Sequence, residues 1–113
     1  YPHPLRGGGM SSPTQRTLAL LRAEGWIAAI TEHWNPYARI RQDLFGFVDV
    51  LAVRGPETLA VQTTSGSNVS ARVRKIEESE YLPAVRDAGW GIEVHGWKKD
   101  KKGRWQCRRV NLS

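Results

Sequence analysis

The chain has 113 residues, a length that fits one domain with its own hydrophobic core. Hydrophobic residues make up 40% of the sequence and charged residues 25%, as in ordinary globular domains, and no apolar run reaches the ~18 residues of a membrane span. The single cysteine, Cys107, excludes an internal disulfide and a cysteine-rich zinc site. A net charge of +6 favours a polyanionic partner such as nucleic acid, although solubility alone explains the charge of many small basic proteins.

The first residues differ in composition from the rest of the chain. Tyr1 to Gly9 contain two prolines and three consecutive glycines and show no apolar period. Because Met10 follows, we expect Tyr1 to Gly9 to be a disordered expression tag and residues 10–113 to form a single domain.

A helix is the first predicted element. Ser12 is placed to cap it, Pro13 suits its first position, and Gln15 completes a capping box. We expect the helix to run to Glu24 and to end at Gly25, which can adopt the left-handed conformation.

Three strands are expected next, in segments rich in β-branched and aromatic residues. They are Trp26 to Trp34, Phe47 to Val53 and Thr58 to Thr64. Tyr37 to Gly46 is expected to be a loop, and the turn at Arg54 to Glu57 predicts a hairpin of the second and third strands.

A helical crossover and a second hairpin complete the expected order. The helix is Ala71 to Ser79, which Pro83 restarts and Gly89 ends, and the strands are Trp90 to Trp97 and Arg104 to Val110. This order predicts an α/β fold with a mixed central sheet flanked by helices.

Polar residues interrupt two of the predicted central strands. Asp49 lies within an apolar run, and a buried carboxylate requires a cation, a donor or water; an aspartate at a strand edge that accepts backbone N–H bonds is the simpler alternative. Gln62 and Thr64 share one face of the next strand because side chains alternate. If the hairpin places Asp49 beside Gln62, their oxygens suit Mg²⁺, which can bind phosphate and activate water.

The element order and two motifs resemble the PD-(D/E)XK, or restriction-endonuclease-like, nuclease superfamily. Phe45-Gly46-Phe47-Val48-Asp49 is similar to the first motif, and Val61-Gln62-Thr63-Thr64 is similar to the second. The segment from Arg41 to Lys75 most resembles small phage and bacterial members related to Holliday junction resolvases. The resemblance implies an αβββαββ core and DNA cleavage in the cytoplasm of a bacterial or phage-infected cell.

The resemblance also implies site residues. Asp49, Gln62 and Thr63 would hold Mg²⁺ or Mn²⁺, and the catalytic set would be Asp49, Gln62 and Thr64. Glutamate is commoner than Gln62 in the family, and Thr64 stands in place of a lysine that stabilises developing phosphate charge. Arg72 is one candidate for the missing cation, and Lys75 is the other.

Further polar and aromatic residues have less specific readings. Glu32 and Glu24 are candidates for an additional acid, and Asp43 is expected to pair with Arg39 or Arg41. We expect His33 and His95 to be surface or core histidines whose ring nitrogens have hydrogen-bond partners. Three tryptophans are expected to pack helices onto the sheet: Trp34, Trp90 and Trp97.

Contacts with DNA are expected from basic and polar residues beside the site. They are Arg39, Arg41, Ser67, Asn68, Arg72 and Lys75. The loop before the second helix offers hydroxyl and backbone N–H groups to phosphate. The basic hairpin turn from Lys98 to Gly103 is a further source of contacts, or a solvated turn that protects a sheet edge.

The residues together predict a metal-dependent DNA endonuclease. An inactive DNA-binding or accessory module on the same fold is the alternative, because the motif lysine is missing, and a small basic adaptor protein is a third reading. Cleavage of both strands by so small a chain would suggest a homodimer. No membrane association is expected.

Overall fold

A five-stranded mixed sheet forms the centre of the protein, as the computed structural model shows for residues 12–113. The elements are α1 (Pro13–Ala23), β1 (Ile27–Ile30), β2 (His33–Asn35), β3 (Ile40–Gln42), β4 (Val50–Arg54), β5 (Glu57–Ser65), the 3₁₀ turn η1 (Gly66–Asn68), α2 (Val69–Glu77), α3 (Leu82–Asp87), β6 (Gly91–Lys99) and β7 (Trp105–Asn111). The predicted tag, Tyr1 to Gly9, lies outside the described residues.

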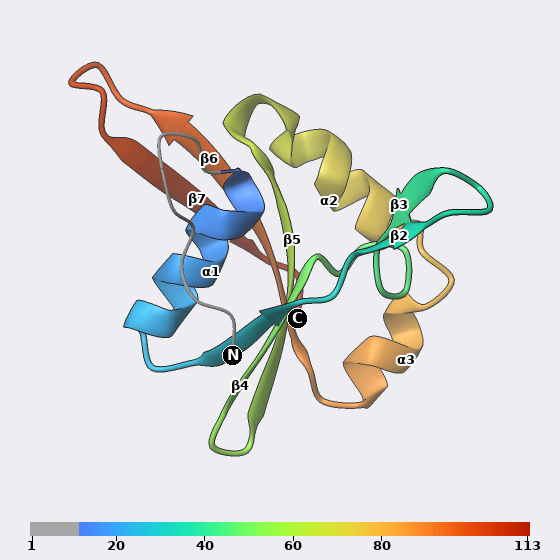
Figure 1. Ribbon diagram of the computed structural model, residues 1–113. Coiled ribbons are helices and arrows are strands. Elements are labelled where there is room, and N and C mark those ends of the chain that lie inside the picture. The colour runs from blue at the N-terminus through green and yellow to red at the C-terminus, as the bar shows by residue number, and fades with distance from the viewer. Residues whose placement is uncertain (1–11) are drawn as a thin grey trace.

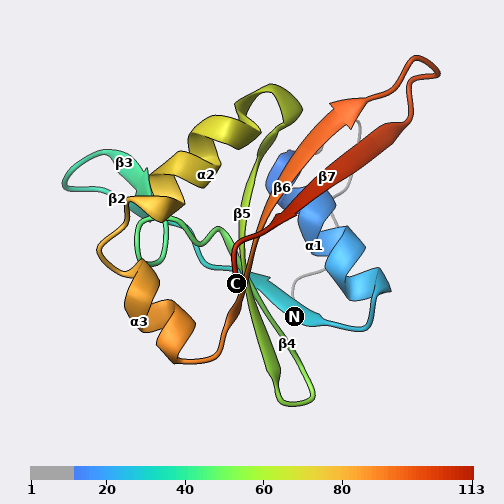
Figure 2. The same ribbon diagram turned by 180° about the vertical axis from the view of Figure 1, so that it is seen from behind.

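The strands follow the order β1-β4-β5-β6-β7. Neighbours are antiparallel except β5 and β6, which are parallel because the crossover through α2 and α3 joins them. Helix α1 covers one face of the sheet, and α2 and α3 cover the other (Figure 1; Figure 2 shows the same layers from behind). The predicted mixed sheet flanked by helices is therefore confirmed.

Helix α1 begins and ends at the predicted signals. The Ser12 hydroxyl accepts a hydrogen bond from the backbone N–H of Gln15 at 3.2 Å, and Gly25 follows the helix at φ +92°. Leu18 and Leu21 then bury against the β4–β5 side of the sheet. This packing places the first turn of α1 beside the end of β5.

Helix α2 lies unusually close to the sheet at its start. A Cβ atom added at Gly96 of β6 would lie 2.2 Å from Cγ2 of Val69, so only glycine allows this approach. Ile76 of α2 and Val85 of α3 complete the core on this face, with Val94 of β6. The first turn of α2 is thereby held next to the end of β5.

The predicted strand from Trp26 to Trp34 is wrong beyond Ile30. The chain leaves the sheet there, where Thr31 donates its backbone N–H to the carbonyl of Asp49 and its hydroxyl to the carbonyl of Val48, both at 2.8 Å. Residues 33–35 pair instead with residues 40–42 in a separate hairpin, the β2–β3 hairpin, within the segment predicted to be a loop. Asn35 shapes its turn by accepting two backbone N–H bonds.

The second predicted strand, Phe47 to Val53, begins later than expected. Leu44 and Val48 hydrogen-bond to each other in both directions and close a tight turn over residues 44–48. Phe47 and Val48 remain buried, but the regular strand starts only at Val50. The other predicted strands and helices are found within a few residues of their expected bounds.

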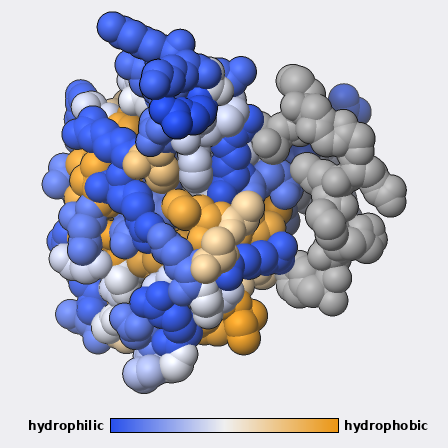
Figure 3. Space-filling view, turned by 90° about the vertical axis from the view of Figure 1, so that its left-hand side faces the viewer, coloured by the Kyte–Doolittle hydropathy of each residue, from blue (hydrophilic) through white to orange (hydrophobic). Residues whose placement is uncertain are grey.

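The hairpin of β6 and β7 extends beyond the body of the protein as an arm (Figures 1 and 2). Its tip forms the hydrophilic projection at the top of Figure 3 and carries exposed basic side chains. They are Lys98, Lys99, Lys101, Lys102 and Arg104. None of the helices within residues 12–113 is long and apolar enough to cross a membrane.

Candidate metal centre

Asp49 and Gln62 lie side by side on neighbouring segments of the sheet. Val50 pairs with Val61 in the β4–β5 hairpin, and the backbone N–H of Asp49 donates to the carbonyl of Val61 at 2.9 Å. The Gln62 amide Nε2 donates to Asp49 Oδ2 at 2.7 Å, and the backbone N–H of Thr63 donates to the same oxygen at 2.8 Å. The alternation of the strands therefore brings the two side chains together, as the hairpin predicted.

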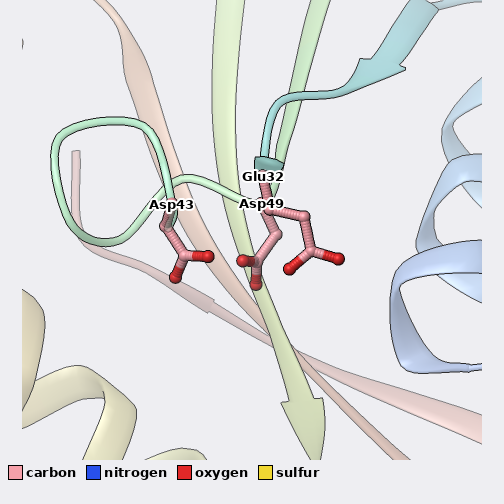
Figure 4. Close-up of side chains that lie close together, drawn as sticks. All are labelled: Glu32, Asp43 and Asp49. Carbon is pink, nitrogen blue, oxygen red and sulfur yellow. The ribbon is translucent and has the colours of Figure 1, made fainter. Parts of the chain in front are cut away.

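Two further acids join Asp49. One carboxylate oxygen from each of Glu32, Asp43 and Asp49 lies within 4.8 Å of the others, and the three side chains point into one space (Figure 4). Glu32 comes from the segment between β1 and β2, and Asp43 directly follows β3. Because the tight turn joins residues 44 and 48, it also brings their neighbours, Asp43 and Asp49, together.

The expected pairing of Asp43 with Arg39 or Arg41 is wrong. Asp43 instead forms a hydrogen bond with Asp49 and an ion pair with Lys75, whose Nζ lies 3.6 Å from Oδ2. The sequence contains no local signal for this arrangement, since it depends on the turn and on the position of α2.

The environment of Asp49 favours the protonated form of its carboxyl. Burial raises the pKa of its carboxyl to about 7, the hydrogen bond with Asp43 also raises it, and the N–H donated by Thr63 opposes both effects. Clustered carboxylates repel one another, and a bound cation relieves this repulsion as a proton does. The raised pKa of Asp49 is therefore the electrostatic behaviour expected of a cation site without its cation.

Gln62 offers a further oxygen to the same site. Its side chain is 3% exposed and its Oε1 accepts no hydrogen bond from any group within residues 12–113. A buried polar atom without a partner is costly in a folded protein, which makes a ligand the natural partner here. Carboxylate and amide oxygens are hard donors, so the residues present fit Mg²⁺ or Mn²⁺.

The acids open into a hollow of about 330 Å³ between the first turns of α1 and α2. Thr14 of α1 lines one side, where its hydroxyl lies 2.8 Å from that of Thr63, and Arg72 of α2 lines the other. Asp49 is thus buried and Glu32 and Asp43 are half-buried, and all three line an accessible space. Its size suits a phosphate group and water.

A cation lies beside Thr64, the position where the family resemblance leads us to expect a lysine. Thr64 is 5% exposed, and the Arg72 Nε donates to its hydroxyl at 3.5 Å. Arg72 lines the same hollow as the acids, whereas Lys75 is paired with Asp43. Of the two candidate cations, Arg72 is therefore the one beside Thr64.

The other candidate residues divide between surface and core. Glu24 lies outside the cluster and pairs with Arg109 at 2.7 Å. His95 is fully buried and satisfied, with Nδ1 3.1 Å from the Thr17 hydroxyl and Nε2 2.8 Å from Glu93, which confirms its reading as a core histidine.

Two of the three tryptophans pack as expected. Trp97 donates its indole N–H to Thr17 of α1 at 2.9 Å, and Trp90 packs against the core under α3. Trp34 lies on the β2–β3 hairpin and is 53% exposed, so the prediction that it packs a helix onto the sheet is wrong.

Four more of the residues expected to contact DNA are exposed, but none of the four lines the hollow that holds the acids. Arg39 and Arg41 are exposed on the β2–β3 hairpin, and Ser67 and Asn68 are exposed in η1.

Comparisons of the chain with protein-family models, with curated proteins and with solved structures each give no match. The function is therefore inferred from the chemistry of the site.

Proposed function

We propose that the protein is a metal-dependent endonuclease that hydrolyses DNA phosphodiester bonds on a restriction-endonuclease-like core. The observation that carries the proposal is the convergence of three carboxylates at an open hollow that Gln62 also lines, where the Gln62 Oε1 has no hydrogen-bond partner within residues 12–113. The order α1-β1-β4-β5-α2-β6, with β5 and β6 parallel, is the order that the family resemblance implies. Both observations favour hydrolysis of a charged ester.

Glu32, Asp43, Asp49 and the Gln62 amide oxygen would hold Mg²⁺ or Mn²⁺. Such an ion would neutralise phosphate charge and would make a bound water molecule easier to deprotonate. Gln62 Nε2 and the Thr63 N–H orient the Asp49 carboxylate by donating to a single oxygen, Oδ2. These two hydrogen bonds restrict rotation of the carboxylate and so fix the orientation of its other oxygen.

Arg72 would take over the role of the missing lysine. Its guanidinium is positively charged at every physiological pH and lines the hollow beside Thr64. A fixed positive charge at this position stabilises the negative charge that develops on phosphate during attack. Thr64 then positions Arg72 through its hydroxyl instead of supplying charge itself.

The surroundings of the hollow suit a DNA backbone. Arg39 and Arg41 are exposed on the β2–β3 hairpin, and Ser67 and Asn68 are exposed in η1, which directly follows the hollow-lining Ser65. They present charge and hydrogen-bond donors of the kind that contact phosphate. The overall charge of +6 adds attraction over a longer range. A homodimer would present two such sites for cleavage of both strands.

The absence of a lysine at position 64 favours a second candidate function. An inactive DNA-binding module would keep the basic surroundings of the site and the same fold. It would bind DNA in a salt-dependent manner and leave it intact with every divalent metal.

Incubation with labelled DNA duplexes, both intact and carrying unpaired nucleotides, separates these functions. We expect nicking with Mg²⁺ or Mn²⁺ by the wild type and by Glu57→Gln, an exposed acid at the far end of the sheet, and no nicking in EDTA. Asp49→Asn should bind DNA without cutting it. Undiminished cleavage by Asp49→Asn, or cleavage in EDTA, would contradict the proposal, and binding without cleavage by the wild type would support the inactive module.

A further inference from the structure

A second hollow adjoins the acid cluster. It measures about 570 Å³ and lies between the β2–β3 hairpin, the turn of residues 44–48 and the segment that joins α2 to α3. Asp43 lines both this hollow and the one that holds the acids, so the two spaces meet at that side chain. A volume of this size falls within the ~300–1,000 Å³ of sites that accept small organic molecules.

Two aromatic rings form part of its wall. Phe45 and Tyr81 are 37% and 47% exposed, and their ring centroids lie 5.8 Å apart at an interplanar angle of 37°. Trp90 supports Phe45 from another side, with a centroid distance of 6.0 Å. Rings that are fixed by neighbouring rings and still exposed offer a planar partner a ready stacking surface.

The backbone at Phe45 is strained in a way that keeps its ring at the surface. Phe45 has φ +55°, a left-handed conformation that bulky side chains rarely adopt, and Gly46 follows at φ +80°. Two residues later, Phe47 is 1% exposed in the core. The turn thus buries one phenylalanine and presents the other to the hollow.

Positive charge lines the same space. Arg41 is exposed on β3 and forms no ion pair with another of the residues 12–113, and Lys75 of α2 lies on the opposite wall with its Nζ 3.6 Å from Asp43. The hollow therefore combines aromatic rings, which can contact a base, with cations, which can contact phosphate, and it lies next to the proposed site of phosphate chemistry. The base has planar faces, and the backbone on both sides of it is anionic.

We propose that this hollow accepts an unpaired nucleotide beside the scissile phosphate, so that the substrate is DNA with a bulged or otherwise unpaired nucleotide rather than intact duplex. The inference rests on the proposed endonuclease function. A base within a duplex has both faces covered by its neighbours, so Phe45 and Tyr81 can stack only on a base that has left the stack. Stacking recognises the ring system and predicts little dependence on base identity.

Binding in EDTA, where the proposed reaction cannot proceed, tests the inference. Two labelled duplexes are compared by fluorescence anisotropy, one intact and one with a single bulged 2-aminopurine, whose emission also reports stacking. We expect tighter binding of the bulged duplex with quenched emission. Tyr81→Ala should weaken that binding by roughly 5- to 100-fold, the effect of losing one stacking ring, and should leave intact duplex unaffected.

Control variants separate the loss of a stacking ring from other effects of mutation. Tyr81→Phe keeps the ring and should bind as the wild type does, as should Val53→Ala, an exposed apolar residue on β4. Phe45→Ala should reproduce the loss, with a melting curve to confirm folding. Equal affinity for the two duplexes, or unchanged emission and affinity in Tyr81→Ala, would overturn the inference.

The inference and the endonuclease proposal can fail separately. Metal-dependent cleavage without preference for the bulged duplex would overturn the nucleotide hollow and leave the endonuclease proposal intact. Preference for the bulged duplex, lost in Tyr81→Ala, without cleavage in Mg²⁺ or Mn²⁺ would support the hollow and overturn the endonuclease.

Discussion

The Nε of Arg72 lies 3.5 Å from the hydroxyl of Thr64 and donates a hydrogen bond to it. If Arg72 supplies the missing charge, Arg72→Ala should lower kcat by about 10²–10³-fold, the usual effect of removing one group that stabilises the transition state. Arg72→Lys should retain part of the activity. The measurement is single-turnover cleavage with Mn²⁺ at saturating DNA.

A rescue experiment makes this prediction specific. Thr64→Lys in the Arg72→Ala background restores a cation at the motif position and should recover part of the lost rate. Arg74→Ala is the matched control, since Arg74 is exposed on the same helix but lines a different surface hollow. Full activity in Arg72→Ala would show that the charge comes from elsewhere.

The raised pKa of Asp49 predicts a pH-dependent stability in EDTA. Burial and the bond with Asp43 place the pKa near 7 in the folded protein, against 3.8 for an ordinary aspartate. Below about pH 4 both states are protonated and the full stability is present. Between about pH 4 and pH 7 the unfolded state loses this proton more readily than the folded state, so the free energy of unfolding falls as pH rises. Above pH 7 the loss is complete and amounts to at most about 4 kcal/mol.

Asp49→Asn removes this titration and keeps an oxygen to accept from Thr63. Urea unfolding in EDTA at several pH values should show that the variant has the flatter profile and exceeds the wild type in stability at pH 8. Parallel profiles for the two proteins would place the titrating group elsewhere. We expect the same variant to lose metal binding. The carboxylate that binds the metal would then be the group that lowers the stability of the metal-free protein.

A metal-linked change is predicted for Gln62→Glu. The new carboxylate would lie where Nε2 is now 2.7 Å from Asp49 Oδ2, so like charges meet in a buried site. We expect a lower melting temperature in EDTA at pH 8, by the equivalent of about 1–3 kcal/mol. Excess MnCl₂ should raise the melting temperature more than in the wild type, because a fourth carboxylate binds the cation more strongly.

Gln106→Glu is the control for that comparison. Gln106 also donates to an aspartate, Asp100 at 3.1 Å, but both side chains lie on the solvated arm. Its replacement should change the melting temperature little with or without metal. An equal response of both variants to MnCl₂ would mean that the effect does not come from the acid cluster.

Most of the central sheet could be predicted from local patterns because its strands are rich in apolar, β-branched and aromatic residues and are bounded by turn residues. Gln62 illustrates this for the site: its strand follows a simple hairpin, so its position opposite Asp49 follows from register alone. Asp49 and Gln62, as polar residues within apolar segments, therefore indicate the position of the candidate site in the sequence.

The acids Glu32 and Asp43 could not be placed in this way. The prediction continued the first strand through Glu32, whereas Thr31 bonds to the backbone of Asp49 and Val48 and directs the chain out of the sheet. Asp43 reaches the site only because Leu44 and Val48 close a turn. Both arrangements depend on contacts between segments, which periodicity within one segment does not encode.

The basic arm predicts how binding depends on salt. Lys98 packs beside Gly66 of η1, which follows the hollow-lining Ser65, and the arm extends away from this point (Figure 1). If Lys101 and Lys102 each contact a phosphate, the double alanine variant should reduce the slope of log K against log salt by roughly 0.9 per contact. The rate of cleavage at saturating DNA should not change.

The alternative for these charges is a solvated turn. Asp100 shapes the turn by accepting the backbone N–H groups of Lys102 and Arg104, so the arm does not need its lysines to fold. Arg54→Ala, at the opposite end of the sheet, gives the slope change caused by a remote charge (Figure 1). A slope change no larger than this control would assign the lysines to protection of a sheet edge. A larger one would extend the DNA path from the hollow along the arm.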